Sequence, residues 1–323
     1  MRSVVTGGAG FIGSHIVDAL LEIGHEVLVI DNFSTGRQEN LSSASSQHKS
    51  ALTICNADIA SSTAAQEIIG FKPDNVFHQA AQMNVRYSVE NPQFDATVNV
   101  AGMVNVLDAS VRVGVKHFVF SSTGGAIYGE QESFPAAEDH RIRPECPYGV
   151  GKRAGELYLE YFSRAHGFAG ISLRYANVYG PRQNAKGEAG VIAIFIERLL
   201  RGEVMVINGD GEQTRDFVNV FDVVKANLRA IEKKLGKGFY VYNVGTGVET
   251  SINSIALAIR DLGVKSGFDS KSIELRHGPA LLGEQRRSVV NIGKISRELD
   301  WTVTYSVSQG LSQTFDAFRA VNK

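Results

Sequence analysis

The sequence is short of cysteine, of long apolar runs and of any excess of one charge. Cys55 and Cys146 are its two cysteines, and they stand far apart without a CxxC or another metal-ligand spacing. This argues against a disulfide framework and a structural zinc site, so we expect a reducing, cytoplasmic setting. No apolar run approaches the roughly 18 residues that span a bilayer. The β-branched run at residues 4–6 begins too early for a signal peptide.

Positive and negative charges almost cancel. Lys+Arg 33 against Asp+Glu 34 gives a formal net charge of -1, so no global basic field is present to attract nucleic acid or an acidic membrane surface. His15, His25, His117 and His166 are scattered without a partner spacing, and we predict no metal site. With 323 residues, 43% of them hydrophobic, the chain can bury a full core in one large or two moderate domains.

Short β-branched runs alternate with helix-length amphipathic stretches through the first two thirds of the chain. This alternation predicts an α/β fold with a Rossmann-like, doubly wound parallel sheet and helices on both faces. The predicted strands are residues 3–6, 26–30, 52–55, 75–78, 117–121 and 171–174, and the predicted crossover helices are residues 12–23, 97–113 and 147–165.

The regular alternation weakens from about Tyr179, where Gly/Pro-rich turns interrupt shorter elements. We therefore predict a first domain at residues 1–178, completed by 216–247 returning to the sheet. A smaller C-terminal α/β substrate-binding region would take residues 179–215 and 248–323. The Ser-rich residues 33–50 lack periodicity and are predicted to form a surface loop.

A glycine pattern follows the first predicted strand. In TGGAGFIGSH, residues 6–15, Gly7, Gly10 and Gly13 are spaced three apart before an apolar helical face. Glycine permits the tight turn, lets backbone amides approach a pyrophosphate and allows the helix to pack closely on the strand. Asp31 ends the second strand, where a carboxylate can accept hydrogen bonds from both ribose hydroxyls but repels a 2′-phosphate, which favours NAD over NADP. Asp58, after the third strand, either flanks the adenine or caps the next helix.

A tyrosine and a lysine stand four apart at the start of a predicted helix. Tyr148 and Lys152 therefore share one face of that helix. A nearby cation favours the phenolate, which suits a general base. The preceding strand ends in Ser121, Ser122 and Thr123, whose hydroxyls would face the cofactor cleft of a parallel sheet. Together these groups predict a proton relay beside a hydride acceptor.

Eight sequence motifs are spread over essentially the whole chain. They are TGGAGFIG, DNFSTG at 31–36, HQAAQ at 78–82, SSTGGAIYGE at 121–130, YGVGK at 148–152, LRYANVYGPRQ at 173–183, GDGEQTRDFV at 209–218 and GEQRRSV at 283–289. In these motifs the chain resembles the UDP-glucose 4-epimerase family of extended short-chain dehydrogenases.

The resemblance implies two sets of binding residues, with residues 1–178 as the NAD-binding domain and Arg215 on the sugar nucleotide's diphosphate. The implied NAD contacts are Gly7, Gly10, Phe11, Ile12, Gly13, Asp31, Asn32, Ser34, Gly36, Asp58, Ile59, Ala80, Ala81, Gln82, Asn99, Ser121, Tyr148, Lys152, Tyr175 and Val178. The implied UDP-sugar contacts are Thr123, Tyr148, Asn177, Val191, Ile207, Arg215 and Glu284.

The resemblance also implies a mechanism. Tyr148, as phenolate, removes the proton of the sugar 4-hydroxyl while hydride moves from C4 to the nicotinamide, and Lys152 stabilises the phenolate. The 4-keto sugar then turns its other face and takes the hydride back with inverted configuration. Ser122 or Thr123 would hydrogen-bond the reacting oxygen, and we favour Thr123.

Relatives that begin with the same C4 oxidation differ just after this hydroxyl. Dehydratases resemble the chain but carry Asp-Glu there, and decarboxylases keep a glutamate, whereas this chain has Gly124 and Gly125. We therefore expect an epimerase rather than a dehydratase, a reductase or a non-enzymatic NAD-binding protein.

The identity of the sugar is less constrained by the sequence. Leu281 stands where many relatives place an arginine on the diphosphate, and Arg182, Arg286 or Arg287 would have to replace it. Ser288 leaves room for an N-acetyl group, so UDP-N-acetylglucosamine joins UDP-glucose as an expected substrate, and UDP-glucuronate is an alternative. The family also implies a homodimer paired through the helices predicted at 97–113 and 147–165.

Overall fold

The computed structural model describes residues 1–185, 190–233, 235–280 and 285–321. In these residues seven parallel strands form the main sheet, in the order β10-β6-β5-β4-β1-β2-β3. The strand order reverses between β1 and β4, which opens a crevice at the carboxyl ends of the strands. The strands are β1 (Arg2–Thr6), β2 (Glu26–Asp31), β3 (Leu52–Asn56), β4 (Asn75–His78), β5 (His117–Thr123), β6 (Ala169–Tyr175) and β10 (Gly238–Val244).

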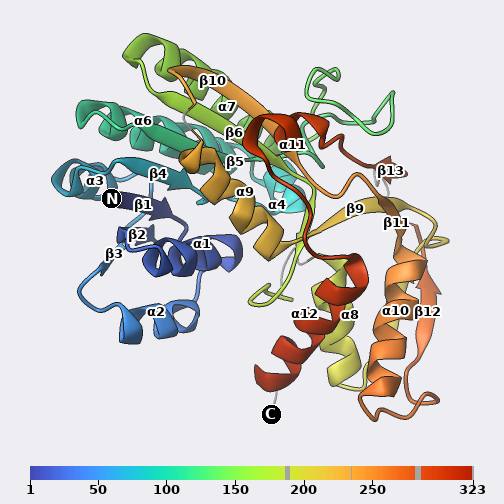
Figure 1. Ribbon diagram of the computed structural model, residues 1–323. Helices are drawn as coiled ribbons and strands as arrows, with labels where there is room; N and C mark the ends of the chain where they lie inside the picture. The colour runs from blue at the N-terminus through green and yellow to red at the C-terminus, as the bar shows by residue number, and fades with distance from the viewer. Residues whose placement is uncertain (186–189, 234, 281–284, 322–323) are drawn as a thin grey trace.

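Helices cover both faces of this sheet (Figure 1). Neighbouring residues of a strand point to opposite faces, so Val5 joins the apolar core under α1 and α9, and Val4 joins the core under α3, α6 and α7. The helices are α1 (Phe11–Glu22), α9 (Val220–Glu232), α3 (Ser62–Phe71), α6 (Met103–Arg112) and α7 (Pro147–His166).

The six strands and three crossover helices predicted from periodicity are confirmed within two residues at most ends. One predicted helix is interrupted, because residues 97–113 begin as a π-turn, η2 (Thr97–Gly102), before α6. This turn follows two short helices, α4 (Val85–Glu90) and α5 (Pro92–Ala96). Single π-turns inside helices occur frequently at functional sites.

The prediction of a surface loop at residues 33–50 is confirmed in part, because most of these residues are exposed or half-buried but the segment is not irregular throughout. A 3-10 turn, η1 (Gln38–Leu41), and a short helix, α2 (Ser42–Gln47), form there. Leu41 and Ala44 are buried in the core beside α1. Two apolar residues among serines are too few to give a helical period, so the sequence pattern does not predict this helix. Its formation depends on tertiary packing against the core.

A second, smaller region lies beyond the carboxyl ends of β5 and β6 (Figure 1). Its core packs three helices against a two-stranded parallel sheet. A further sheet of short strands, centred on β9, joins the two regions. The elements are α8 (Val191–Leu200), α10 (Ile252–Lys265), α12 (Val307–Val321), β8 (Met205–Asn208) and β12 (Leu275–Gly278), with β7 (Asn177–Tyr179), β9 (Thr214–Asn219), β11 (Glu249–Ser251) and β13 (Arg287–Ser288) in the joining sheet and α11 (Gly293–Leu299) beside β10.

After α8 and β8 in the second region, the chain returns to the main sheet. Within residues 216–247, α9 and β10 lie with the main sheet, while β9 stays in the joining sheet. In the part of the chain that the structure describes, no helix is both long and apolar enough to cross a membrane.

Candidate active site

The glycine turn after β1 has no room for side chains. Gly7 has φ +68°, and a Cβ built on it would lie 2.7 Å from the backbone nitrogen of Ala80. A Cβ on Gly13 would lie 2.1 Å from the carbonyl oxygen of Gly7, and one on Gly10 would lie 3.1 Å from the same atom. The first amides of α1 have no intrahelical acceptor and are available to an anion. The turn therefore fits a pyrophosphate.

Asp31 lies at the end of β2, where its carboxylate is held by backbone amides. Oδ2 accepts from Ala9 N (2.9 Å) and Oδ1 from Phe33 N (2.8 Å). Burial raises the pKa of this carboxyl, and the two amide bonds lower it in part. A Cβ on Gly36 would lie 2.8 Å from Oδ1, so a side chain at this position would collide with the carboxylate. Each oxygen retains a lone pair for a ribose hydroxyl.

Three of the predicted NAD contacts, Asn32, Ser34 and Asp58, are joined to one another by hydrogen bonds. Asn32 Nδ2 donates to Asp58 Oδ2 (2.9 Å), and Ser34 Oγ donates to Asn32 Oδ1 (2.7 Å). The alternative that Asp58 caps the next helix is wrong. Ser61 is the N-cap of α3, and its Oγ accepts from the backbone N–H of Ala64 at 3.2 Å. Asp58 instead accepts from Ala60 N, two residues on, and faces Asn32.

A buried polar cluster fixes the loop after β4. Gln82 N donates to Asn99 Oδ1 (3.0 Å), and Asn99 Nδ2 donates back to Gln82 O (2.9 Å). Asp95, 1% exposed, accepts from both side chains through Oδ1, at 2.7 Å and 2.9 Å. Sequence reasoning missed Asp95. Its spacing of four before Asn99 on a helical segment was the available signal.

Tyr148 and Lys152 lie at the start of α7, as predicted, beside the end of β5. Lys152 is 3% exposed, and its Nζ donates to Ser121 O (2.7 Å) and lies 5.8 Å from the centroid of the Tyr148 ring. Burial lowers the pKa of Lys152 to about 7, although the charge of Asp95 acts against this shift. The backbone N–H of Tyr148 donates to Ser88 Oγ (3.2 Å), which ties the start of α7 to α4.

The glycines of the YGVGK motif allow α7 to approach its neighbours closely. A Cβ on Gly149 would lie 2.7 Å from Ala126 O, and one on Gly151 would lie 3.1 Å from Asn99 Cβ. Glycine in a helix costs roughly 1 kcal/mol relative to alanine. Here that cost is offset because the helix can sit against the loop that follows β5 and against η2.

The three hydroxyls at the end of β5 point in different directions. Ser121 Oγ donates to His78 O (3.0 Å), and Ser122 Oγ donates to the fully buried Glu156 (2.8 Å). Thr123 is half-buried, and its Oγ1 accepts from Ala126 N (3.2 Å). Ser122 therefore faces the interior, which disfavours it as the hydroxyl that meets substrate and leaves Thr123 as the candidate.

Glu156 and Arg174 form a buried ion pair behind these residues. Arg174 donates from Nε and Nη2 to the two carboxylate oxygens, each at 2.8 Å. Ser172 Oγ adds a bond at 2.9 Å, and Arg174 Nη1 reaches Tyr128 OH at 3.0 Å. Sequence reasoning missed this network, which fixes β5, β6 and α7 relative to one another.

The predicted substrate residues gather from several elements. A Cβ on Gly125 would lie 3.9 Å from both Thr123 Oγ1 and Asn177 Oδ1, which places these two side chains around one point. Arg215 on β9 is half-buried and donates to Thr214 O (2.8 Å). Val191 begins α8 beside the second region's core.

Other predicted contacts lie deeper in the protein or outside its described part. Ile207 is 2% exposed inside the core of the second region. The Tyr175 hydroxyl bonds Asn227, and burial raises its pKa to about 12. Glu284 and Leu281 lie outside the described residues. The remaining predicted contacts, Phe11, Ile12, Ile59, Ala80, Ala81 and Val178, lie at the start of α1, after β3, after β4 and in β7.

Each of the three arginines considered as a replacement at the diphosphate is ion-paired. Arg286 pairs with Asp210 at 2.7 Å and Arg287 with Glu249 at 2.7 Å. Arg182 pairs with Asp18 at 2.8 Å. An exposed ion pair is weak enough to exchange for a phosphate, so this observation does not choose among them.

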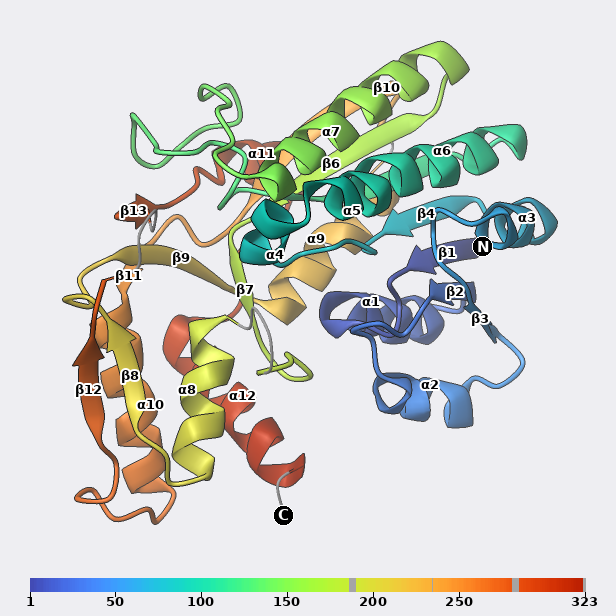
Figure 2. The ribbon, with the colours of Figure 1, turned by 180° about the vertical axis from the view of Figure 1, so that it is seen from behind.

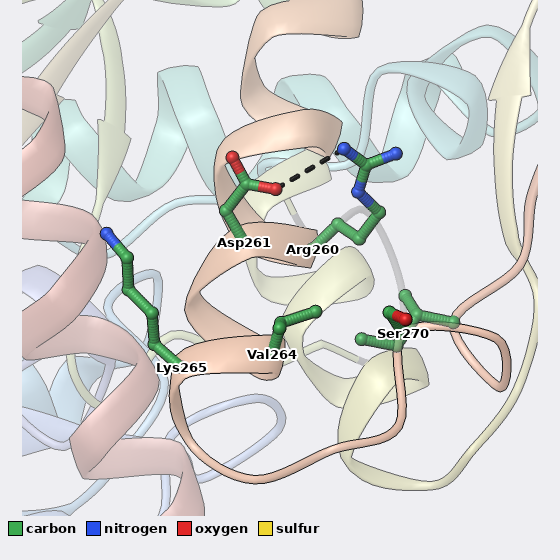
Figure 3. Close-up of a pocket in the computed structure, with 6 residues that line it drawn as sticks. Arg260, Asp261, Val264, Lys265 and Ser270 are labelled. Carbon is green, nitrogen blue, oxygen red and sulfur yellow. Dashed lines mark hydrogen bonds and ion pairs between the residues drawn. The ribbon is translucent and has the colours of Figure 1, made fainter.

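A shallow hollow elsewhere on the surface has no link to the predicted site. Its lining side chains belong to α10 and the loop after it, and Arg260 pairs with Asp261 at 3.3 Å beside Lys265 (Figure 3). Within the described ranges, His, Cys, Asp and Glu side chains form no group of three that could hold a metal ion.

Comparisons with known proteins identify the family and agree with the fold. The model of the NAD dependent epimerase/dehydratase family matches residues 3–245. A UDP-glucose 4-epimerase from Thermotoga maritima, solved with UDP-glucose, is 43% identical and covers 100% of both chains at a TM-score of 0.92. A UDP-glucose 4-epimerase from Thermus thermophilus, solved with NAD, is 40% identical over 99% of both chains at a TM-score of 0.88. A UDP-N-acetylglucosamine 4-epimerase from Methanobrevibacter ruminantium is 34% identical, covering 99% of this chain and 98% of the other at a TM-score of 0.90.

Proposed function

Because the chain belongs to the NAD dependent epimerase/dehydratase family, we propose that it is an NAD-dependent UDP-hexose 4-epimerase that interconverts UDP-glucose and UDP-galactose. The observation that carries the proposal is the arrangement at the end of β5. Lys152 Nζ lies 5.8 Å from the centroid of the Tyr148 ring and donates to Ser121 O, two residues before Thr123 on the same strand. Gly124 and Gly125 stand where a diverting acid or base would be needed.

The chain's own residues account for the proton chemistry. The ammonium of Lys152 favours the phenolate of Tyr148, which takes the proton of the sugar 4-hydroxyl and returns it after inversion. Thr123 Oγ1 hydrogen-bonds the reacting oxygen, and Arg215 binds the diphosphate that tethers the sugar. When bound, NAD supplies the hydride acceptor at C4 and gives the hydride back.

The packing around Gly124 supports an epimerase over a dehydratase. A Cβ at this position would lie 2.9 Å from Val290 Cγ1, 3.3 Å from Tyr175 O and 3.4 Å from Arg174 O. A carboxylate side chain therefore does not fit at residue 124 without displacing buried groups. With no group to expel the C6 hydroxyl, return of the hydride is the remaining fate of the ketone.

A second substrate pair, UDP-N-acetylglucosamine and UDP-N-acetylgalactosamine, has its own support. The support is the UDP-N-acetylglucosamine 4-epimerase from Methanobrevibacter ruminantium, which is 34% identical over 99% of this chain. Ser288, the small residue predicted to admit an N-acetyl group, pairs in register with Arg215 in the joining sheet and is 4% exposed. A larger side chain there would press on the strand that carries Arg215. UDP-glucuronate is the alternative substrate.

The active form is proposed to be a homodimer formed through α7. Val150, Leu157 and Tyr161 are 54%, 50% and 59% exposed, and their spacing of seven and four places them in one stripe along the helix. An exposed apolar stripe on a helix that the family pairs with itself is best covered by a second copy. The cytoplasmic location rests on the two free cysteines.

One experiment tests the activity. The purified protein, with no NAD added, is incubated separately with UDP-glucose, UDP-N-acetylglucosamine and UDP-glucuronate, and the C4 epimers are resolved by chromatography. UDP-galactose formed from UDP-glucose supports the proposal, and dehydrated or decarboxylated products refute it. Size-exclusion chromatography with light scattering tests the dimer, which Leu157→Glu is expected to dissociate.

A further inference from the structure

Residues 180–184, called the strap below, cross from the second region to the helix that starts the NAD-binding fold. They leave the end of β7 and run beside α1 in both views (Figures 1 and 2). The first contact is made by His15 on α1, whose Nε2 donates to Pro181 O at 3.0 Å. Burial lowers the pKa of His15 to about 4, so a neutral ring whose Nε2 carries the hydrogen makes this bond at pH 7.

The second contact is an ion pair on the next turn of α1. Arg182 Nη1 lies 2.8 Å from Asp18 Oδ2, and each side chain is 26% exposed. Arg182 has φ +67°, a backbone conformation that a residue with a side chain rarely adopts. Such a conformation persists where surrounding contacts hold it, and the bonds of Pro181 and Arg182 to α1 are such contacts.

The third contact lies at the other end of the strap. Arg37 Nη2 donates to Asn184 Oδ1 at 3.1 Å, and Arg37 N donates to Ala9 O at 2.9 Å in the glycine turn. Arg37 follows Gly36, whose Cα faces the carboxylate of Asp31. The strap therefore ends beside the position predicted for the adenosine ribose.

These contacts join the strap to two elements that carry predicted NAD residues. The strap begins two residues after Val178, itself a predicted NAD contact, bonds His15 and Asp18 on the helix that follows the glycine turn, and reaches Arg37 next to Gly36. We propose that the strap closes the dinucleotide cleft and that the Asp18–Arg182 ion pair and the Arg37–Asn184 hydrogen bond retain NAD between turnovers. This inference rests on the proposed function.

Retention has a chemical purpose in this reaction. The hydride taken from the sugar must return to the same molecule. If the cofactor left in its reduced form, the 4-keto sugar would have no hydride donor and could not be converted to product. NAD can leave only when the strap detaches from α1 and from the loop after β2. Loss of either contact should therefore raise the rate of NAD release.

The test measures NAD release directly. NAD-loaded protein is mixed with excess alcohol dehydrogenase and ethanol, which reduce each released NAD, and absorbance at 340 nm is followed. Asp18→Asn and Asn184→Ala should each release NAD about two- to fivefold faster than the wild type, and together about tenfold faster, the scale of half-exposed polar contacts.

A matched control removes a similar ion pair from the opposite face of the sheet. Asp108→Asn breaks the Asp108–Arg112 pair on α6, 2.7 Å long, and should leave NAD release unchanged. If Asp18→Asn and Asn184→Ala both release NAD at the wild-type rate, the proposal that the strap retains NAD is wrong. If only one of them releases NAD faster, that contact alone retains the cofactor, which contradicts a strap that closes the cleft. A wild type that binds no NAD contradicts the proposed function itself, so the two failures are distinguishable.

Discussion

The buried ion pair on α7 allows a quantitative prediction of stability. Glu156 is fully buried and receives two bonds from Arg174, each 2.8 Å long. Ser122, Ser172 and the partly exposed Arg153 donate to it as well. Glu156→Gln keeps the shape but leaves the guanidinium of Arg174 buried without a counter-charge. Removing one partner of a buried pair costs about 3–5 kcal/mol of unfolding free energy. Urea titration followed by circular dichroism measures this change.

The same helix provides the control. Glu160 pairs with Arg164 at 3.6 Å, and the two side chains are 35% and 68% exposed, so Glu160→Gln should cost less than about 1 kcal/mol. A Glu156→Gln protein as stable as Glu160→Gln would refute the assignment of the network as a fixed support of the site.

The pH dependence of this difference has a defined sign. Burial raises the pKa of Glu156, but the bonds and charge of Arg174 outweigh it and leave the pKa below the ordinary 4.5. A lowered carboxyl pKa contributes stability that is fully present above pH 4.5 and lost as the pH falls through the folded-state value. The gap between wild type and Glu156→Gln should therefore shrink below pH 4.5.

Two further pairs of substitutions each compare one residue at the site with a control residue. Gly149→Ala would place a Cβ 2.7 Å from Ala126 O and should destabilise the protein by about 1–3 kcal/mol despite the better helix propensity. Gly70→Ala on α3, with nothing within 4 Å of its Cβ, should stabilise it by up to about 1 kcal/mol. Urea titrations compare the two, and equal effects would contradict the close approach of α7. Thr123→Ala should lower kcat about 10²-fold, whereas Ser122→Ala should mainly lower stability, by about 1–3 kcal/mol; the reverse order in steady-state kinetics would make Ser122 the hydroxyl that meets substrate.

Local sequence patterns predicted most of the main sheet, but they did not delimit the elements of the second region. Alternating periodicity predicted the six strands and three helices because each buries a regular face, and the glycine turn was visible because close approach demands glycine at Gly7 and Gly13. The short helix α2 was missed because Leu41 and Ala44 give no period among serines.

The site was predictable only where a motif has a fixed spacing. Tyr148 and Lys152 share one helix, so their proximity follows from the sequence. The partners of Glu156 and the direction of Ser122 depend on how β5, β6 and α7 pack together. Asp95 contacts Gln82 across a loop, a pairing that the order of residues does not reveal.

The fate of the hydrogen at C4 tests the central claim most directly. The purified protein is given UDP-glucose carrying deuterium at C4, in ordinary water, and the UDP-galactose formed is examined by mass spectrometry and NMR. Our account predicts product that retains the deuterium at C4 with inverted configuration, and no product from Tyr148→Phe. Protium at C4, or a turnover by Tyr148→Phe equal to that of the wild type, would contradict it.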